Sequence, residues 1–350
     1  MEFNKSIYEL CPELNGKKFY LHSRFAKTAS NFLHDCVFKR LKNDTFFYMP
    51  NAAINKVLLN SHDKKEFSDD DVANIVDTIV SELKGVTQEH VFIRGFDFFT
   101  DVWSEYSNHH NGYKLYSTLF PDATIFLVLR NQVDMLVSLL RHTIPTTACP
   151  PSVDKFLNFK DGKYMGKAPR PFHNVNVFGY DYFKFVEELN GYFPNARVEV
   201  LFYEDLKDNP DDFIKSVLDV LPCELEAPIE ARKRENRGLS ALSINLAMWL
   251  RKLSELPFLT KRDASGLPLK EAIKAAKPWD LPFMLFRRAL LRLRVPANTF
   301  LFKVLDKYIY VDWDIIGKEK RESISDYYFE INKKLLPFLN GRIKKYYIRD

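Results

Sequence analysis

Continuous apolar runs alternate with helix-type periodicity over the first two thirds of the chain. Four of these runs have strand length, at residues 18–22, 90–95, 123–130 and 197–203. They are mostly apolar, and we interpret them as continuous runs rather than alternating ones, which is typical of strands buried on both faces of a parallel sheet. The pattern therefore predicts four strands in the interior of one sheet.

Two helices between these runs have clear boundary signals. Ser68 begins a helix over 68–84 as its N-cap, three aspartates follow in the first turn, and Gly85 ends it. A second helix, over 209–221, begins with an Asn cap and has Pro at the first helical position. Strands alternating with such helices indicate βαβ units, so we predict an α/β fold with a doubly wound, mainly parallel sheet.

The pattern changes after about residue 238 to helices and irregular stretches that contain proline. We expect one domain over 1–350, with an α/β core at 1–238 and a helical C-terminal subdomain or lid at 239–350.

Composition narrows the class of protein. The net charge of +5 is too small for a nucleic-acid footprint, although it is compatible with an anionic ligand. The four cysteines lie far apart and form no C-x-x-C pair, which argues against a zinc site and against a disulfide framework. We see neither a secretory signal nor a membrane-spanning apolar run, so the expected location is the cytoplasm.

Candidate chemistry lies where the predicted strands end, because open parallel sheets bind ligands at the carboxyl ends of their strands. The first strand is followed by "HSRFAKTASNFL" and an amphipathic helix. The backbone N–H groups of residues 28–31 would point at an anion from the start of this helix, with Lys27 as a charge beside it. By itself this segment could equally be a turn that contains a solvent-facing lysine.

The third strand ends in Arg130, and Ser138 lies eight residues further on. A guanidinium and a hydroxyl on one helix face could form a second phosphate clamp. Two further segments follow, "YEDL" at 203–206 with "NP" at 209–210, and "RENRGLS" at 234–240.

Taken in order, these segments resemble the sulfotransferases that use 3′-phosphoadenosine 5′-phosphosulfate (PAPS). Members of that family carry a "PKSGTTWL" or "PKTG" loop after the first strand, where this chain has "AKTASNFL". They also have an Arg followed by a Ser eight positions on, a "YEDL…NP" segment and a basic Asn/Gly turn. The resemblance implies a single sulfotransferase-like domain with a P-loop-like nucleotide site, PAPS as the donor without a metal, and a carbohydrate hydroxyl as the acceptor.

The resemblance also implies roles for individual residues. The 5′-phosphosulfate would be bound by Lys27 and the amides of Thr28, Ala29, Ser30 and Asn31. The 3′-phosphate would be bound by Arg130 and Ser138, with Tyr203 near the adenine and Arg237 and Gly238 closing over the phosphate. Lys27 would neutralise the charge that develops on the leaving phosphate.

Two departures from the family pattern matter. Ala29 stands where the family has glycine, and the cradle is preserved if its φ stays negative, as at a right-handed helix start. The general base is not marked by a histidine after the second strand, and Asp97 is our prediction for it, with His109, His110 and His142 as alternatives. A helix cap is an equally good interpretation of Asp97.

Other interpretations stay open. The α/β pattern also suits a small-molecule kinase or a glycosyltransferase, although the G-K-[ST] of a kinase P-loop is absent. A non-catalytic relative that binds an anion or a glycan is a further alternative. The arginines of "MLFRRALLRLRV", from residue 284, form either a solvated helix face or a surface for an acidic glycan or a membrane headgroup, which leaves peripheral membrane contact open.

Overall fold

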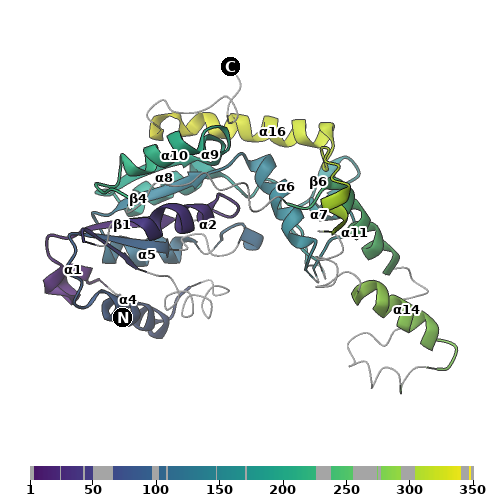
Figure 1. Ribbon diagram of the computed structural model, residues 1–350, viewed down its shortest axis with the longest axis horizontal. Coiled ribbons are helices and arrows are strands. Elements are labelled where there is room, and N and C mark those ends of the chain that lie inside the picture. Colours follow the sequence, from purple (N-terminus) through teal and green to yellow (C-terminus); the bar gives the residue numbers. More distant parts are fainter. Residues whose placement is uncertain are drawn as a thin grey trace. The chain divides into compact units, whose positions relative to one another are not determined.

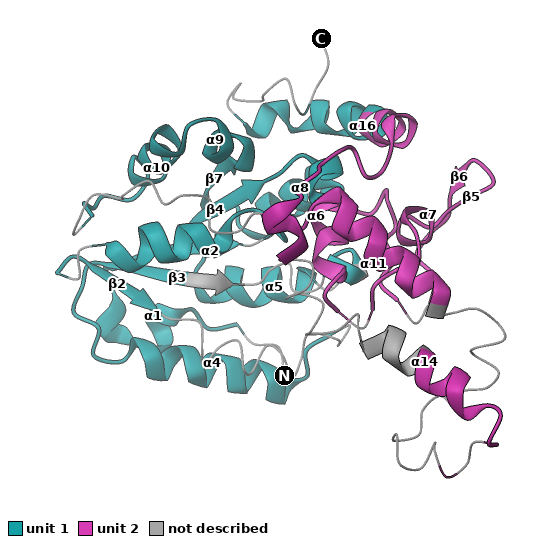
Figure 2. Cartoon of the chain, turned by 45° about the vertical axis from the view of Figure 1, so that its right-hand side comes forward, with its two compact units in different colours: residues 1–135, 180–233, 326–350 teal, residues 136–179, 234–325 magenta. Residues whose placement is uncertain are grey.

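The structure, a computed structural model, describes most of the 350 residues. The described residues are 4–23, 25–41, 44–49, 66–96, 102–107, 109–146, 148–169, 172–225, 238–254, 274, 277–292, 304–339 and 347. They divide into two compact units (Figure 2). The first unit comprises residues 1–135, 180–233 and 326–350, and the second comprises 136–179 and 234–325.

A five-stranded parallel sheet forms the centre of the first unit, in the order β2-β3-β1-β4-β7. Its strands are β1 (Lys18–Ser23), β2 (Phe46–Met49), β3 (His90–Phe96), β4 (Thr124–Leu129) and β7 (Arg197–Phe202). The predicted α/β class and all four predicted strands are confirmed. The fifth strand, β2, is an edge strand of four residues that the sequence analysis did not identify.

Helices cover both faces of this sheet, as a doubly wound fold requires (Figure 1). One face packs against the segment after β1 and against α10 (Pro210–Leu218), through a cluster that includes Phe38, Phe92 and Phe213. The Phe38 and Phe92 ring centroids are 4.1 Å apart. On the other face Phe19 packs on Phe120, which follows α5 (His109–Leu119), so the strands are apolar on both sides.

The helix boundary signals act as predicted. Ser68 caps α4 (Asp69–Leu83) in a reciprocal capping box with Asp71, and Gly85 follows the helix with a φ of 78°. Asn209 caps α10, which ends at Leu218, three residues before the predicted end. The remaining helices of this unit include α1 (Ile7–Leu10), α8 (Tyr182–Tyr192), α9 (Tyr203–Asp208) and α16 (Lys318–Asn332), whose last residues belong to this unit.

The second unit is mainly helical. It contains most of α6 (Gln132–Thr143), together with α7 (Val153–Phe156), α11 (Ala241–Ser254), α14 (Leu281–Arg292) and the start of α16. A two-stranded antiparallel hairpin, β5 (Phe159–Lys160) and β6 (Lys163–Tyr164), completes it. Lys320 pairs with Asp154 at 3.2 Å within this unit. The division of the chain into one domain with a C-terminal lid stays a prediction.

A buried carboxylate, that of Glu204, connects Tyr347 to the residues at the end of the sheet. The Glu204 side chain is 7% exposed, accepts a hydrogen bond from the Asn131 backbone N–H at 2.8 Å, and accepts another from the Tyr347 hydroxyl at 2.6 Å. Each hydrogen bond compensates part of the cost of burying the carboxylate. Glu204 therefore fixes the backbone directly after Arg130.

Replacing Tyr347 with Phe is expected to destabilise the fold by about 1 to 3 kcal/mol, because one buried carboxylate oxygen loses its donor. Urea unfolding measures the change. Tyr308→Phe is the matched control: that side chain is 75% exposed, so its free energy of unfolding should change by less than about 0.5 kcal/mol. Equal losses in both variants would contradict the role of the Glu204 hydrogen bond.

Candidate active site

The candidate site lies where the chain reverses its direction of travel across the sheet. From β1 the chain continues to β2 and β3 on one side, and then to β4 and β7 on the other. Such a switch point opens a crevice at the carboxyl ends of the two strands beside it, here β1 and β4. The segment after Ser23 and the residue after Leu129 therefore meet at this point.

Arg130 joins three strand ends. Its Nη1 donates a hydrogen bond to the Lys27 carbonyl oxygen at 2.8 Å, across the β1–β4 boundary. Its guanidinium carbon lies 4.3 Å from the ring centroid of Tyr203, the first residue after β7. Such a cation–π contact holds the guanidinium plane in place. Three residues predicted for the site, Lys27, Arg130 and Tyr203, are thus brought together.

The loop after β1 is held by aromatic residues distant in sequence. Phe25 is 1% exposed and packs edge-on against Tyr106 and Tyr182. The Ala26 backbone N–H donates to the Tyr106 hydroxyl at 3.0 Å, and the Tyr182 hydroxyl donates to the Arg130 carbonyl at 2.9 Å. These contacts fix both strand ends relative to each other.

The sign of the backbone torsion angle φ changes from residue to residue in the loop. Lys27 has a φ of 65° and Ala29 a φ of 61°, while Thr28 between them is not in the left-handed region. Alternation of this kind turns successive N–H groups to one side and forms an anion-binding nest. The negative φ named above as the condition for Ala29 is not observed. Ala29 is left-handed at the N-cap of α2 (Ser30–Phe32), which costs an alanine about 1 to 2 kcal/mol.

The other loop residues have different environments. Thr28 is 1% exposed, and its hydroxyl donates to the Phe25 carbonyl at 2.7 Å, so its side chain closes the turn. Ser30 is partly buried, and Asn31 is exposed. The helix that follows is irregular, with π-helical geometry over Leu33–Val37, and it buries Leu33, Cys36 and Val37 on one side, so it is amphipathic as predicted.

The positive charge of the site favours the binding of an anion. Burial, and secondarily the neighbouring Arg130 cation, lowers the pKa of the Lys27 ammonium from its ordinary value of 10.5. Within the part of the chain that the structure describes, neither Lys27 nor Arg130 forms an ion pair with a carboxylate. Among the described residues, two buried polar atoms at the ends of β1 and β4, Ser23 Oγ and Arg130 Nε, have no hydrogen-bond partner. An anion bound there would satisfy both the charges and the donors.

Ser138 and Gly238 lie in the second unit. Ser138 is partly buried on α6. A Cβ atom added to Gly238 would lie 3.3 Å from Cδ of Arg141, one turn after Ser138, so the glycine permits a close approach of backbone to side chain. Nη2 of Arg141 also pairs with Asp312 at 2.8 Å.

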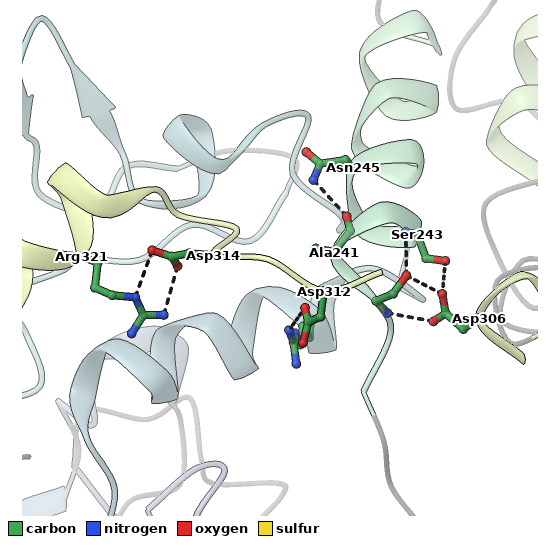
Figure 3. Close-up of polar contacts among 9 residues, drawn as sticks. Ala241, Ser243, Asn245, Asp306, Asp312, Asp314 and Arg321 are labelled. Carbon is green, nitrogen blue, oxygen red and sulfur yellow. Dashed lines mark hydrogen bonds and ion pairs between the residues drawn. The ribbon is translucent and has the colours of Figure 1, made fainter. Parts of the chain in front are cut away.

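The segment after Gly238 leads into α11 (Figure 3). The Ser240 hydroxyl accepts a hydrogen bond from the Ser243 backbone N–H at 3.1 Å and so caps the helix. Asp306 accepts from the Ser240 backbone N–H at 2.8 Å and from the Ser243 hydroxyl at 2.6 Å (Figure 3). This network fixes the chain that leaves Gly238.

Two predicted site residues, Asp97 and Arg237, lie outside the described residues. Among the alternative bases, His109 is 7% exposed; its Nδ1 is 2.7 Å from the Tyr106 carbonyl oxygen, and its Nε2 contacts the Glu188 carboxylate. It therefore fastens α5 to α8. His110 is partly buried on the same helix, and His142 is exposed on α6. No group of three metal-ligating side chains occurs among the residues that the structure describes.

Comparison with known proteins identifies the family. The model of the sulfotransferase domain matches residues 25–245, more than half of the chain, and the chain belongs to this family. A search of curated sequences returned no significant match. Among solved structures, the chain is similar to the crystal structure of a sulfotransferase from Alicyclobacillus acidocaldarius, with 17% identity, 71% of this chain and 97% of that chain covered, and a TM-score of 0.42. We draw nothing further from a likeness at that score.

Two tyrosines that hold the site in place, Tyr106 and Tyr182, were not predicted from the sequence. A tyrosine in a sequence gives no sign of its hydrogen-bond partner, and these partners lie 80 and 52 residues away. The only available signal was the high aromatic content of 15%.

Replacing Ala29 with Gly is expected to raise the free energy of unfolding by about 0.5 to 1 kcal/mol, because glycine adopts the left-handed region without strain. The gain is reduced by the greater freedom of glycine in the unfolded chain. Urea unfolding measures it. Ala26→Gly is the control, since Ala26 has no positive φ and should lose stability. A loss in both variants would contradict the strain at Ala29.

Proposed function

We propose that this protein transfers a sulfuryl group from PAPS to a hydroxyl of a carbohydrate acceptor. Membership of the family gives sulfuryl transfer in general. The observation that carries the finer proposal is the meeting of Lys27 and Arg130 at the switch point, with an unpartnered Arg130 Nε and no ion pair to a described carboxylate. A phosphorylated nucleotide supplies the missing negative charge.

The residues of the first unit suit the two ends of such a nucleotide. Lys27 and the amides of residues 28–31 would bind the 5′-phosphosulfate, and Arg130 would bind the 3′-phosphate. Tyr203 would lie near the adenine, and the contact of its ring with the Arg130 guanidinium would keep that group in place. We assign Ser138, Gly238 and Arg237 to the 3′-phosphate by resemblance to the family.

PAPS supplies an activated sulfuryl group, so the protein has chiefly to position the reactants and stabilise charge. The Lys27 ammonium neutralises the charge that grows on the leaving phosphate, and its partial burial strengthens that interaction. A general base takes the proton of the acceptor hydroxyl, and Asp97 is our proposal for it. The carbohydrate acceptor is favoured by the resemblance to glycan-modifying relatives, in which a carboxylate serves as the base.

The test of donor binding is calorimetry with adenosine 3′,5′-bisphosphate, the product that PAPS leaves behind. We expect binding by the natural protein, and Arg130→Ala should weaken it about tenfold or more, because a charged hydrogen bond is lost. Lys27→Ala should lower the transfer of radiolabelled sulfate to a carbohydrate panel by about 100-fold or more while the fold persists.

Lys39→Ala is the matched control, because Lys39 lies in the same segment and, among the described residues, pairs with the exposed Asp35 at 3.0 Å. It should bind and turn over as the natural protein does. Absence of nucleotide binding at high concentration would refute PAPS as the donor. Nucleotide binding without transfer to any acceptor would instead indicate a non-catalytic relative.

Nucleotide binding should also take up protons at alkaline pH. Lys27 has a lowered pKa in the free protein, and a bound dianion would raise that pKa again, because it favours the charged ammonium. Between the lowered pKa and 10.5 the free lysine is partly neutral, so affinity falls with rising pH and binding protonates it. Binding heats in two buffers with different ionisation enthalpies measure the uptake. Lys39→Ala should retain it, and retention by Lys27→Ala would contradict the assignment.

A further inference from the structure

Most of the exposed large apolar side chains among the described residues belong to the second unit, which is magenta in Figure 2. Three of the four tryptophans of the chain lie in it and are exposed: Trp249 by 55%, Trp279 by 67% and Trp313 by 46%. Single exposed apolar residues are ordinary, but clustered ones mark an interaction surface. The α14 helix carries the clearest cluster.

Four apolar residues of α14 and its first turn share one face. Backbone hydrogen bonds from Leu281 to Lys277 and from Met284 to Asp280 extend the helical geometry back to residue 277. Positions 279, 282, 283 and 286 therefore follow the i, i+3, i+4, i+7 spacing of a single stripe. All four are exposed, and the stripe consists of Trp279, Pro282, Phe283 and Phe286.

Met284 of α14 is already covered by a contact within the second unit. Met284 is 0% exposed, and α14 packs against α11 within the same unit. Met284 lies two positions from Phe286, on the other side of the helix axis. The stripe thus faces away from the contact that holds α14 in this unit.

Positive charge accompanies the exposed rings. The Lys277 ammonium lies 5.8 Å from the Trp279 ring centroid, and the Lys307 ammonium lies 5.7 Å from that of Tyr308. On α11 the exposed Trp249 and Lys252 are three positions apart and share a face. The sequence from 277 to 294 contains five basic residues, Lys277, Arg287, Arg288, Arg292 and Arg294, against the single acidic Asp280.

We propose that the α14 stripe docks this protein on the surface of an anionic phospholipid bilayer. A helix with an apolar aromatic side and a strongly basic sequence lies in the plane of a membrane interface, with tryptophan at the level of the headgroups. The basic residues are attracted to anionic lipids, which a neutral apolar partner protein would not require. In the described part of the chain no helix is long and apolar enough to span a bilayer.

The experiment measures binding of the full chain to sedimented vesicles. One set contains phosphatidylcholine alone, and the other mixes it with phosphatidylglycerol. The test variant combines Trp279→Ser, Phe283→Ser and Phe286→Ser. The control variant combines Met165→Ser and Leu336→Ser, whose side chains are 51% and 38% exposed and lie outside α14. Urea unfolding checks that both variants fold, which their exposure predicts.

We expect the natural protein and the control to bind the anionic vesicles, to bind neutral ones weakly, and to dissociate as salt is raised. The stripe variant should bind about 100-fold more weakly, because three aromatic side chains no longer leave water. Tryptophan emission should shift to shorter wavelength on binding. Absence of binding to anionic vesicles, or equal binding by the stripe variant, would overturn the proposal. So would lipid-independent dimerisation that only the stripe variant loses, which would assign the stripe to a second copy of the chain.

Discussion

The hydrogen bond from Arg130 to the Lys27 carbonyl oxygen is the contact on which the candidate site depends. It joins the ends of β1 and β4, and the stacking of the same guanidinium on Tyr203 adds the end of β7. The arrangement has a cost, because burial, and secondarily the nearby Arg130 cation, lowers the pKa of Lys27. A site of this kind is completed by an anion, because bound negative charge removes the repulsion and supplies the absent acceptors.

The protein keeps this arrangement in place by aromatic packing and buried hydrogen bonds. Tyr106 and Tyr182 hold the backbone on the two sides of the switch point, and Glu204 holds the residue after Arg130. Each of these groups is buried, so the strand ends cannot shift without leaving a polar group unsatisfied. The positions of Lys27 and Arg130 are therefore set before a ligand arrives, which reduces the cost of ordering them on binding.

The sequence predicted the parts of this protein that are encoded locally. Long apolar runs identified β1, β3, β4 and β7, and caps identified α4 and α10, because burial and capping leave a pattern within a few residues. The edge strand β2 has only four residues, too few for such a pattern, and was missed.

At the candidate site, Lys27 and Arg130 were predicted from their places after strands. The hydroxyls that hold them were not, because those contacts join residues far apart in the chain. The positive φ of Ala29 was not foreseen either, because alanine rarely adopts the left-handed region and its letter in the sequence gives no sign of it.

The left-handed alanine bears on how phosphate-binding loops are found. A glycine in such a loop is usually taken as the signature, yet glycine is only the residue that adopts this torsion angle most easily. Here alanine adopts it, and the packing of Phe25 and the bond from Ala26 hold the loop on which it lies. A search for a glycine-containing sequence motif does not find this loop, whereas a search that compares backbone torsion angles would find it. Families that anchor such loops strongly should therefore tolerate the loss of their glycines, and their most divergent members are best sought by geometry.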